Sequence, residues 1–446
     1  MCFNWYRLKL TVPEQINSTD VTGSTIVLET ALDDYAEVWI DGEIPHYQGQ
    51  TGGTVVTGWN ADQRVIVRRN ARPKENIQIA IFGINGPISV APANYIFVRH
   101  ARLVFYPGLY QPVAADRDTE VNITVDRFDP QIDKIIPKNP KLYKLADGFE
   151  FTEGPVWRHD HLLFSDPNAN IVYRLDPTGR LAVFRSNSGL ADYAGIDIAK
   201  LAQAGANGNT LDSQGRLTTC EMGNRRITRT ESDGTITVLT DRYEGKRFNS
   251  PNDLVYKSDG SLYFTDPPFG LRKMFDDPSR ELNFSGVFRW KDNKTTLITK
   301  ELNGPNGIAF SPDEKYLYVD NWDTKKVWLM RYPLNIDGTV AQGKLIFDLT
   351  GVPPTDTAFD AMKMDKLGNM YITGPGGING GIWVLTPDGK RLGFFELPKQ
   401  AHNLNWGGSE GKDLYITAMN AVYRMPLLVE GVQAGVHTLD SGTKPK

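Results

Sequence analysis

Apolar and polar residues alternate in short runs along most of this 446-residue chain. Runs such as STIVLET, AEVWIDG and RVIVRR are separated by Gly, Asn, Asp and Pro. Alternation with a period of two predicts half-buried strands that end at turns. Only residues 189–205 have a helical look, and we interpret them as an insertion. The pattern therefore predicts an all-β protein.

The length of the chain exceeds what one hydrophobic core usually holds, so we expect two domains. Residues 1–106 are predicted to form a small, jelly-roll-like β-sandwich. Residues 107–141 are rich in Pro and Asp and read as a linker that packs partly as extra strands. Residues 142–446 form the second domain.

One hairpin pattern recurs throughout the second domain. Each copy has a small or polar residue, a strand, a turn that usually contains glycine and a second strand. The copies are EGPVWRHDHLLFSD, NGNTLDSQGRLTTCE, PNDLVYKSDGSLYFTD, PNGIAFSPDEKYLYVD, DAMKMDKLGNMYITG and HNLNWGGSEGKDLYITA. Most copies precede two further strands, and four strands per repeat are typical of a propeller blade. We predict a six-bladed β-propeller in which residues 142–148 and the tail after Ala421 share one blade.

Each copy begins with an oxygen-bearing side chain just before its first strand. Because the first strands of a propeller line its channel in one direction, these side chains should converge at one end. They are Glu153, Asn207, Asn252, Asn306, Asp360 and Asn403. Two carboxylates with several amide oxygens suit a divalent cation, Ca²⁺ best, with Mg²⁺, Mn²⁺ or Zn²⁺ as alternatives. The other interpretation is that each residue only caps a turn.

Two further positions have alternative interpretations. His402 lies beside Asn403 and is either a proton carrier or a satisfied polar residue. Asp266, followed by Pro267 and Pro268, either caps the end of a strand or binds a second cation.

Composition and missing motifs exclude several classes of function. A net charge of -4, with both signs spread along the chain, argues against a nucleic-acid partner. No apolar run reaches the ~20 residues of a membrane span. The sequence lacks H-E-x-x-H and P-loop motifs, and it has no G-x-S-x-G elbow between a strand and a helix, since its GGSEG string lies in the turn of a hairpin copy. No signal peptide is visible, and we expect a periplasmic or secreted protein in trimmed form, with a cytoplasmic protein as the alternative.

Several segments between about residues 143 and 425 are similar to a known family. FTEGPVW, GRLTTCEMGNRRITR, DRYEGKRFNSPNDLVYKSDGSLYFTDPPFGL and GPNGIAFSPDEKYLYV resemble gluconolactonase, senescence marker protein (regucalcin) and related calcium-dependent lactonases, in particular their bacterial branch. The resemblance implies a metal held by Glu153, Asn306 and Asp360. It also implies a substrate-binding role for Asn252, with Asn207 in the same pocket.

The first domain lies outside this resemblance. Its segments WYRLKLTVP, LDDYAEVWIDGE and ENIQIAIFGINGP look like a galactose-binding-like sandwich. That likeness implies carbohydrate binding, and a packing or dimerisation role is the alternative.

These observations lead to one functional hypothesis and two alternatives. We expect metal-dependent hydrolysis of a sugar-derived or similar small lactone, with Asp360 and Glu153 as the catalytic carboxylates and Asp360 as general base. Asn252, Asn207, His402 and Asn403 would bind the substrate. The alternatives are a hydrolase of an aryl ester or organophosphate, and a propeller that binds calcium or a glycan without turnover.

Overall fold

Strands dominate the structure, which is a computed structural model. It describes residues 2–16, 19–32, 35–42, 55–56, 62–68, 71–85, 98–106, 113–190 and 201–432. The helical elements in these ranges are two short 3-10 helices, η1 (Pro130–Lys134) and η3 (Met274–Asp276). The all-β prediction is confirmed. Most of the helical-looking segment, residues 191–200, lies outside the described residues. No helix in the described ranges has the length and apolar character to cross a bilayer.

The N-terminal strands form two sheets that share one hydrophobic core. One sheet has the order β1 (Cys2–Thr11), β8 (Asn76–Asn85), β5 (Tyr35–Ile40) and β6 (Val55–Val56). The other has the order β7 (Asp62–Arg68), β4 (Thr25–Leu32) and β9 (Val98–Tyr106), and β2 (Gln15–Ile16) pairs with β3 (Thr19–Asp20). Alternate apolar residues of both sheets, among them Ile26, Val38 and Ile79, are buried together. The period-two pattern thus gives each sheet one apolar face.

Four sheets of the second part each contain four consecutive antiparallel strands. They comprise β13 (Glu153–Arg158), β14 (His161–Asp166), β15 (Ile171–Leu175) and β16 (Leu181–Ser186); β17 (Ala206–Leu211), β18 (Leu217–Glu221), β19 (Arg226–Thr230) and β20 (Ile236–Thr240); β23 (Leu254–Tyr256), β24 (Leu262–Asp266), β25 (Gly286–Lys291) and β26 (Lys294–Thr299); and β27 (Pro305–Phe310), β28 (Tyr316–Asn321), β29 (Trp328–Pro333) and β30 (Lys344–Asp348). A small hairpin, β21 (Arg242–Tyr243) with β22 (Lys246–Arg247), precedes β23. Each sheet follows the repeat seen in the sequence.

Two larger sheets combine a repeat with strands from earlier in the chain. One contains β31 (Met362–Met364), β32 (Met370–Gly374), β33 (Gly381–Leu385) and β34 (Arg391–Glu396), with β11 (Val125–Arg127) at its edge. The other contains β35 (Ala401–Gly407), β36 (Asp413–Ala418), β37 (Ala421–Pro426), β12 (Leu142–Asp147) and β10 (Val113–Val121). As the sequence predicts, residues 142–148 share a sheet with the segment after Ala421. Two strands from residues 107–141 extend these sheets.

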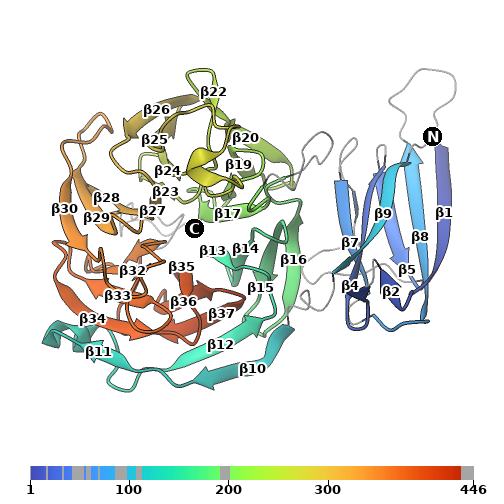
Figure 1. Ribbon diagram of the computed structural model, residues 1–446, viewed down its shortest axis with the longest axis horizontal. Helices are drawn as coiled ribbons and strands as arrows, with labels where there is room; N and C mark the ends of the chain where they lie inside the picture. The colour runs from blue at the N-terminus through green and yellow to red at the C-terminus, as the bar shows by residue number, and fades with distance from the viewer. Residues whose placement is uncertain are drawn as a thin grey trace, which may run out of the picture.

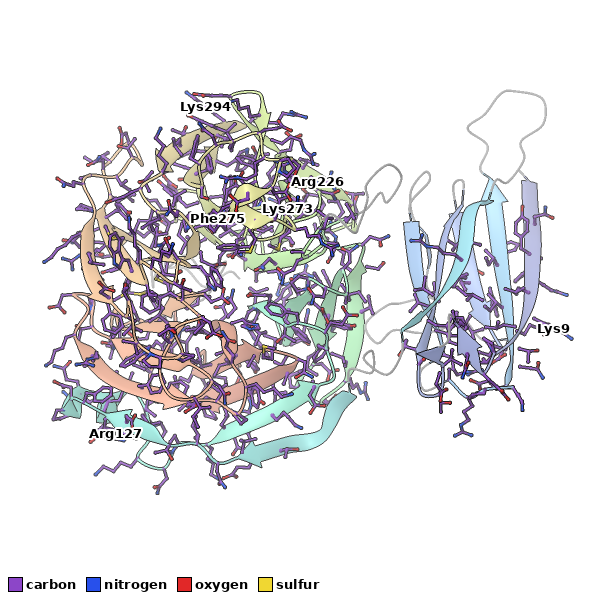
Figure 2. The ribbon with its side chains drawn as sticks, in the orientation of Figure 1. Lys9, Arg127, Arg226, Lys273, Phe275 and Lys294 are labelled. Atoms are coloured by element: carbon purple, nitrogen blue, oxygen red, sulfur yellow. The ribbon has the colours of Figure 1, made fainter. Side chains whose placement is uncertain are left out.

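The first strands of these six sheets surround a common centre. Strand β13 contacts β17, and contacts continue in order through β23, β27, β31 and β35, which contacts β13 again. Figure 1 shows the six sheets arranged around this centre, and we call them the ring. Side chains fill the spaces between neighbouring sheets, whereas Lys294 lies at the outer rim (Figure 2). Every first strand is therefore packed between two others.

Polar side chains near the ends of the second strands join neighbouring sheets. The residue before the last one of each second strand is fully buried in all six sheets: Ser165, Cys220, Thr265, Asp320, Thr373 and Thr417. The Thr265 hydroxyl donates to the Asn306 carbonyl at 2.8 Å, and the Thr373 hydroxyl donates to the His402 carbonyl at 3.0 Å. These bonds fix the first strand of one sheet against the second strand of the sheet before it.

We expect Thr373→Val to reduce the free energy of unfolding by about 1–3 kcal/mol. Valine keeps the shape but leaves the buried His402 carbonyl and the Ala361 amide, which donates to the Thr373 hydroxyl at 2.9 Å, without this partner. Urea denaturation of both proteins measures the difference. The same change at the exposed Thr237 is the control and should alter stability by less than about 0.5 kcal/mol. Equal effects at both positions would contradict the assigned role of Thr373.

Candidate active site

The structure places all six predicted residues at the start of the first strands of the ring. Glu153 opens β13, Asn207 and Asn306 are the second residues of β17 and β27, and Asn403 is the third of β35. Asn252 and Asp360 precede β23 and β31 by two residues. Asp360 is partly exposed and the other five are buried.

The sequence predicted that all six residues lie just before a first strand. Four of them lie inside the strand instead. The difference arises from register shifts in β13, β17, β27 and β35, each of which has one residue more than its partner strand at that point. Such bulges bend a strand and redirect its side chains. The bulge thus allows a strand residue to occupy the position that a preceding loop supplies in β23 and β31.

Glycines beside two site residues allow the first strands to approach closely. Gly154 follows Glu153 with a φ of +46°, and a Cβ there would lie 2.1 Å from the Asn207 carbonyl oxygen. A Cβ on Gly307 would lie 2.3 Å from an Asp320 carboxyl oxygen. Any larger residue would push apart the strands that carry the site.

The loops before the first strands are held by the last residues of second strands. The Asp266 carboxyl group accepts hydrogen bonds from the Asn249 and Ser250 backbone amides, both at 2.8 Å. Asp166 accepts from the Glu150 amide at 2.9 Å in the same way. Asp266 is therefore a cap that positions the loop carrying Asn252. The alternative of a second cation at Asp266 finds no support, because both carboxyl oxygens face backbone donors.

Each candidate carboxylate is bound by an asparagine from a neighbouring strand. Asn403 Nδ2 donates to Glu153 Oε2 at 3.0 Å, and Asn306 Nδ2 donates to Asp360 Oδ1 at 2.8 Å. The Asn403 amide oxygen accepts the Leu404 backbone amide at 2.8 Å, so only the Asn306 amide oxygen is left for another partner. Asn306 Oδ1 is buried and has no hydrogen-bond partner within the described part of the chain.

Asn207 has a similarly unsatisfied oxygen. Its Oδ1 is buried without a partner among the described residues, while its Nδ2 contacts Met222 Sδ at 3.4 Å. A thioether is a weak acceptor, so this contact leaves much of the amide's hydrogen-bonding capacity unused. Buried acceptors without donors are rare in folded proteins and often indicate an absent ion, water or ligand.

The pKa values of the two carboxyl groups are both raised in the metal-free protein. Burial, followed by the charge of Asp360, raises the pKa of Glu153 well above its usual value. Burial also raises the pKa of Asp360 to about 7, although the hydrogen bond from Asn306 opposes this shift. A cation bound between the two groups would lower both pKa values again.

The available oxygen atoms fit a hard divalent cation. The described residues contain no group of three or more His, Cys, Asp and Glu side chains that could hold a metal. The candidate site differs from such a group because it combines two carboxylates with the amide oxygens of asparagines. The unsatisfied oxygens of Asn306 and Asn207 beside Glu153 and Asp360 match the oxygen ligands that Ca²⁺ takes.

His402 is buried beside the site. Its ring stacks on Phe151 with 4.1 Å between centroids, and Nδ1 lies 3.4 Å from the Thr152 carbonyl oxygen. Burial lowers the pKa of His402 to about 4, so the imidazole is neutral at physiological pH. This argues against the proton-carrier hypothesis and leaves His402 as a neutral hydrogen-bonding group.

The structure also brings together residues that the sequence did not single out. Asp253 directly follows Asn252, and its Oδ2 accepts a hydrogen bond from Lys363 Nζ at 3.0 Å. Asp320 is fully buried behind Gly307, whose amide donates to it at 2.9 Å. The Asn-Asp pair in PNDL was visible, but nothing in the alternation distinguishes Lys363 from an outward-facing strand residue.

Comparison with known proteins identifies the family. Residues 151–420 match the model of the SMP-30/Gluconolactonase/LRE-like region. The chain belongs to this family. A gluconolactonase of Zymomonas mobilis is 35% identical over 315 residues, which cover 68% of this chain and 85% of that protein. The chain is an enzyme, a hydrolase of the lactonase type.

Solved structures agree with the family assignment. A gluconolactonase from Xanthomonas campestris is 29% identical and has a TM-score of 0.57, covering 72% of this chain and 98% of that one. Regucalcin from Agrobacterium tumefaciens, described as a calcium-binding protein, is 18% identical with a TM-score of 0.52, covering 65% of this chain and 95% of that one. The likeness to regucalcin shows the shared fold of this SMP-30/gluconolactonase family member.

We expect the free energy of unfolding of this protein, kept metal-free by a chelator, to fall as pH rises from about 5 to about 8. The folded pKa values of Glu153 and Asp360 are raised, so the native state keeps protons that the unfolded chain has released. Urea denaturation across this range measures the slope. Glu153→Gln should make the fall smaller, and the exposed Glu410→Gln should not. An unchanged slope in Glu153→Gln would contradict the assignment.

Proposed function

We propose that the protein hydrolyses a sugar-derived or similar small lactone at a divalent cation in the centre of the ring. The observation that carries this proposal is the arrangement of Glu153 and Asp360. Each carboxylate is bound by a neighbouring asparagine, and the buried Asn306 and Asn207 oxygens lack partners among the described residues. The 35% identity to a gluconolactonase supports a lactone as the substrate class.

Glu153, Asn306 and Asp360 would hold the ion, which we propose to be Ca²⁺. The calcium-binding regucalcin among the solved structures and the all-oxygen donor set support this choice. When bound, the ion supplies a Lewis acid that polarises a carbonyl group and stabilises negative charge on its oxygen. Asn403 and Gly154 hold Glu153 Oε2 through bonds of 3.0 and 2.9 Å, which fix the direction of its other oxygen.

The remaining side chains would bind and orient the lactone. Asn252 is buried, and its backbone amide and carbonyl are held by Thr265 and Gly208 at 2.9 and 2.8 Å. Asn252 and Asn207 can donate to hydroxyl groups or the carbonyl oxygen, and neutral His402 and Asn403 complete this side of the site. Asp360 Oδ2 is the atom that would accept a proton from the attacking water. Addition of water and cleavage of the ring C–O bond yield a hydroxy acid.

The fold supports a specific domain assignment. We infer that the six sheets are the blades of a six-bladed β-propeller spanning residues 142–446, with residues 107–141 as a linker that adds edge strands. Residues 1–106 would be a galactose-binding-like sandwich that binds carbohydrate. The two N-terminal sheets around one core support the sandwich. A periplasmic or secreted location fits a sugar-lactone substrate.

Acid release from a panel of aldonolactones at constant pH tests the function. We expect hydrolysis of at least one lactone, its loss after chelation and its recovery on adding Ca²⁺. Aryl esters and an organophosphate belong in the same panel. Faster turnover of either would favour the alternative ester substrate, and no turnover of any compound would favour a non-catalytic binding protein.

We expect Glu153→Gln and Asp360→Asn each to lose cation affinity and activity together, with activity falling by about 10²-fold or more. Each change removes one of two negative charges at the proposed ion. Calorimetric Ca²⁺ titration and lactone hydrolysis are the measurements. The control is Asp356→Asn, which removes an equal charge from an exposed position in the same loop. Full activity of either site variant after exhaustive chelation would refute the assignment.

A further inference from the structure

An ion pair links two parts of the ring whose sheets are not neighbours. Lys363 lies on β31 and Asp253 lies just before β23, and β27 stands between these strands in the ring. Lys363 Nζ is 3.0 Å from Asp253 Oδ2, and the two side chains are only 14% and 2% exposed. The contact therefore joins sheets that are not neighbours, and the lysine side chain reaches past β27.

Lys363 also lines a cavity that extends along the first strands. A hollow of about 670 Å³ is lined by Lys363 and by residues further along the first strands, including Asn209, Ile308 and Asn405. The site residues Asn207, Asn306 and Asn403 stand nearer the beginnings of those same strands. Lys363 thus lies further along β31 than Asp360, on the side where this cavity lies.

Carboxyl groups outnumber cations around this ion pair. Asp253, Asp320, Glu153 and Asp360 contribute four carboxyl groups, and the Asp253 charge acts on each of the other three. Lys363 is the cation that pairs with this group among the described residues. Asp253 Oδ1 accepts the Leu254 amide at 2.8 Å, so its two oxygens are both engaged.

We propose that Lys363 is a positioning residue that serves as a built-in cation, neutralising Asp253. This inference rests on the proposed function because it explains how one divalent ion can be matched to Glu153 and Asp360 alone. With its charge compensated, Asp253 acts as a rigid neighbour of Asn252 and does not compete for the ion. A buried carboxylate that lost its partner would destabilise the fold or attract a cation.

The test compares variants by calorimetric Ca²⁺ titration and by melting temperature with and without chelator. Lys363→Met should melt several degrees below wild type when metal-free. It should bind Ca²⁺ about tenfold more tightly or take up an additional ion, because an uncompensated charge lies near the site. Lys363→Arg should resemble wild type. Lys366→Met is the matched control, since Lys366 pairs with Glu430 at the surface.

The double variant Lys363→Met/Asp253→Asn separates charge from packing. It should recover the melting temperature and the Ca²⁺ affinity of wild type, because neither charge remains. The proposal is wrong if Lys363→Met matches wild type in both measurements, or if the double variant binds Ca²⁺ as tightly as Lys363→Met. It is also wrong if the single and double variants both fail to fold, since Lys363 would then act through packing.

The outcome can be separated from that of the proposed function. Wild-type protein without Ca²⁺ binding and without lactone hydrolysis would contradict the proposed function. The role of Lys363 would then be decided by the metal-free melting temperatures. Lys363→Met must melt below the double variant if Asp253 needs compensation, and equal values would overturn the inference.

Discussion

Repulsion among buried carboxylates at the centre of the ring is the constraint on which the candidate site depends. Burial raises the pKa values of Glu153 and Asp360, the Asp360 charge raises that of Glu153 further, and the Asp253 charge acts on both. A folded chain must compensate these charges by protons, by fixed donors or by a cation. The structure uses fixed donors for part of the charge, through Asn403, Asn306 and Lys363. The carboxylate charge that these donors leave uncompensated favours a divalent cation as the ligand.

The surrounding structure keeps these donors in place without itself taking part in chemistry. Thr265 and Thr373 bond each first strand to the preceding sheet, and Asp266 holds the loop before Asn252. Gly154 permits the close approach that brings Asn207 beside Glu153. Because every site residue lies at the beginning of a first strand, a shift of one sheet would change distances at the shared centre. Closure of the ring therefore supplies rigidity to the site.

The repeats in the sequence predicted much of this arrangement but not its finer features. Each copy contains its own hairpin, so local alternation was enough to find the strands and the six oxygen-bearing residues. The bulges in β13, β17, β27 and β35 carry no comparable signal, because they depend on pairing between strands. The neutral state of His402 likewise results from burial against Phe151, which single-sequence patterns do not reveal.

The surroundings of Lys363 could not be predicted from the local sequence pattern. In the sequence it is a polar residue between two buried methionines of β31, the ordinary pattern of a strand with one solvent-facing side. In a closed ring, however, the side that would face solvent in an open sheet is enclosed by other first strands. Lys363 lines a cavity with residues of other first strands, and its partner Asp253 comes from a sheet that is not adjacent. The same alternation thus gives a surface lysine or a buried cation, depending on whether the sheets close around a centre.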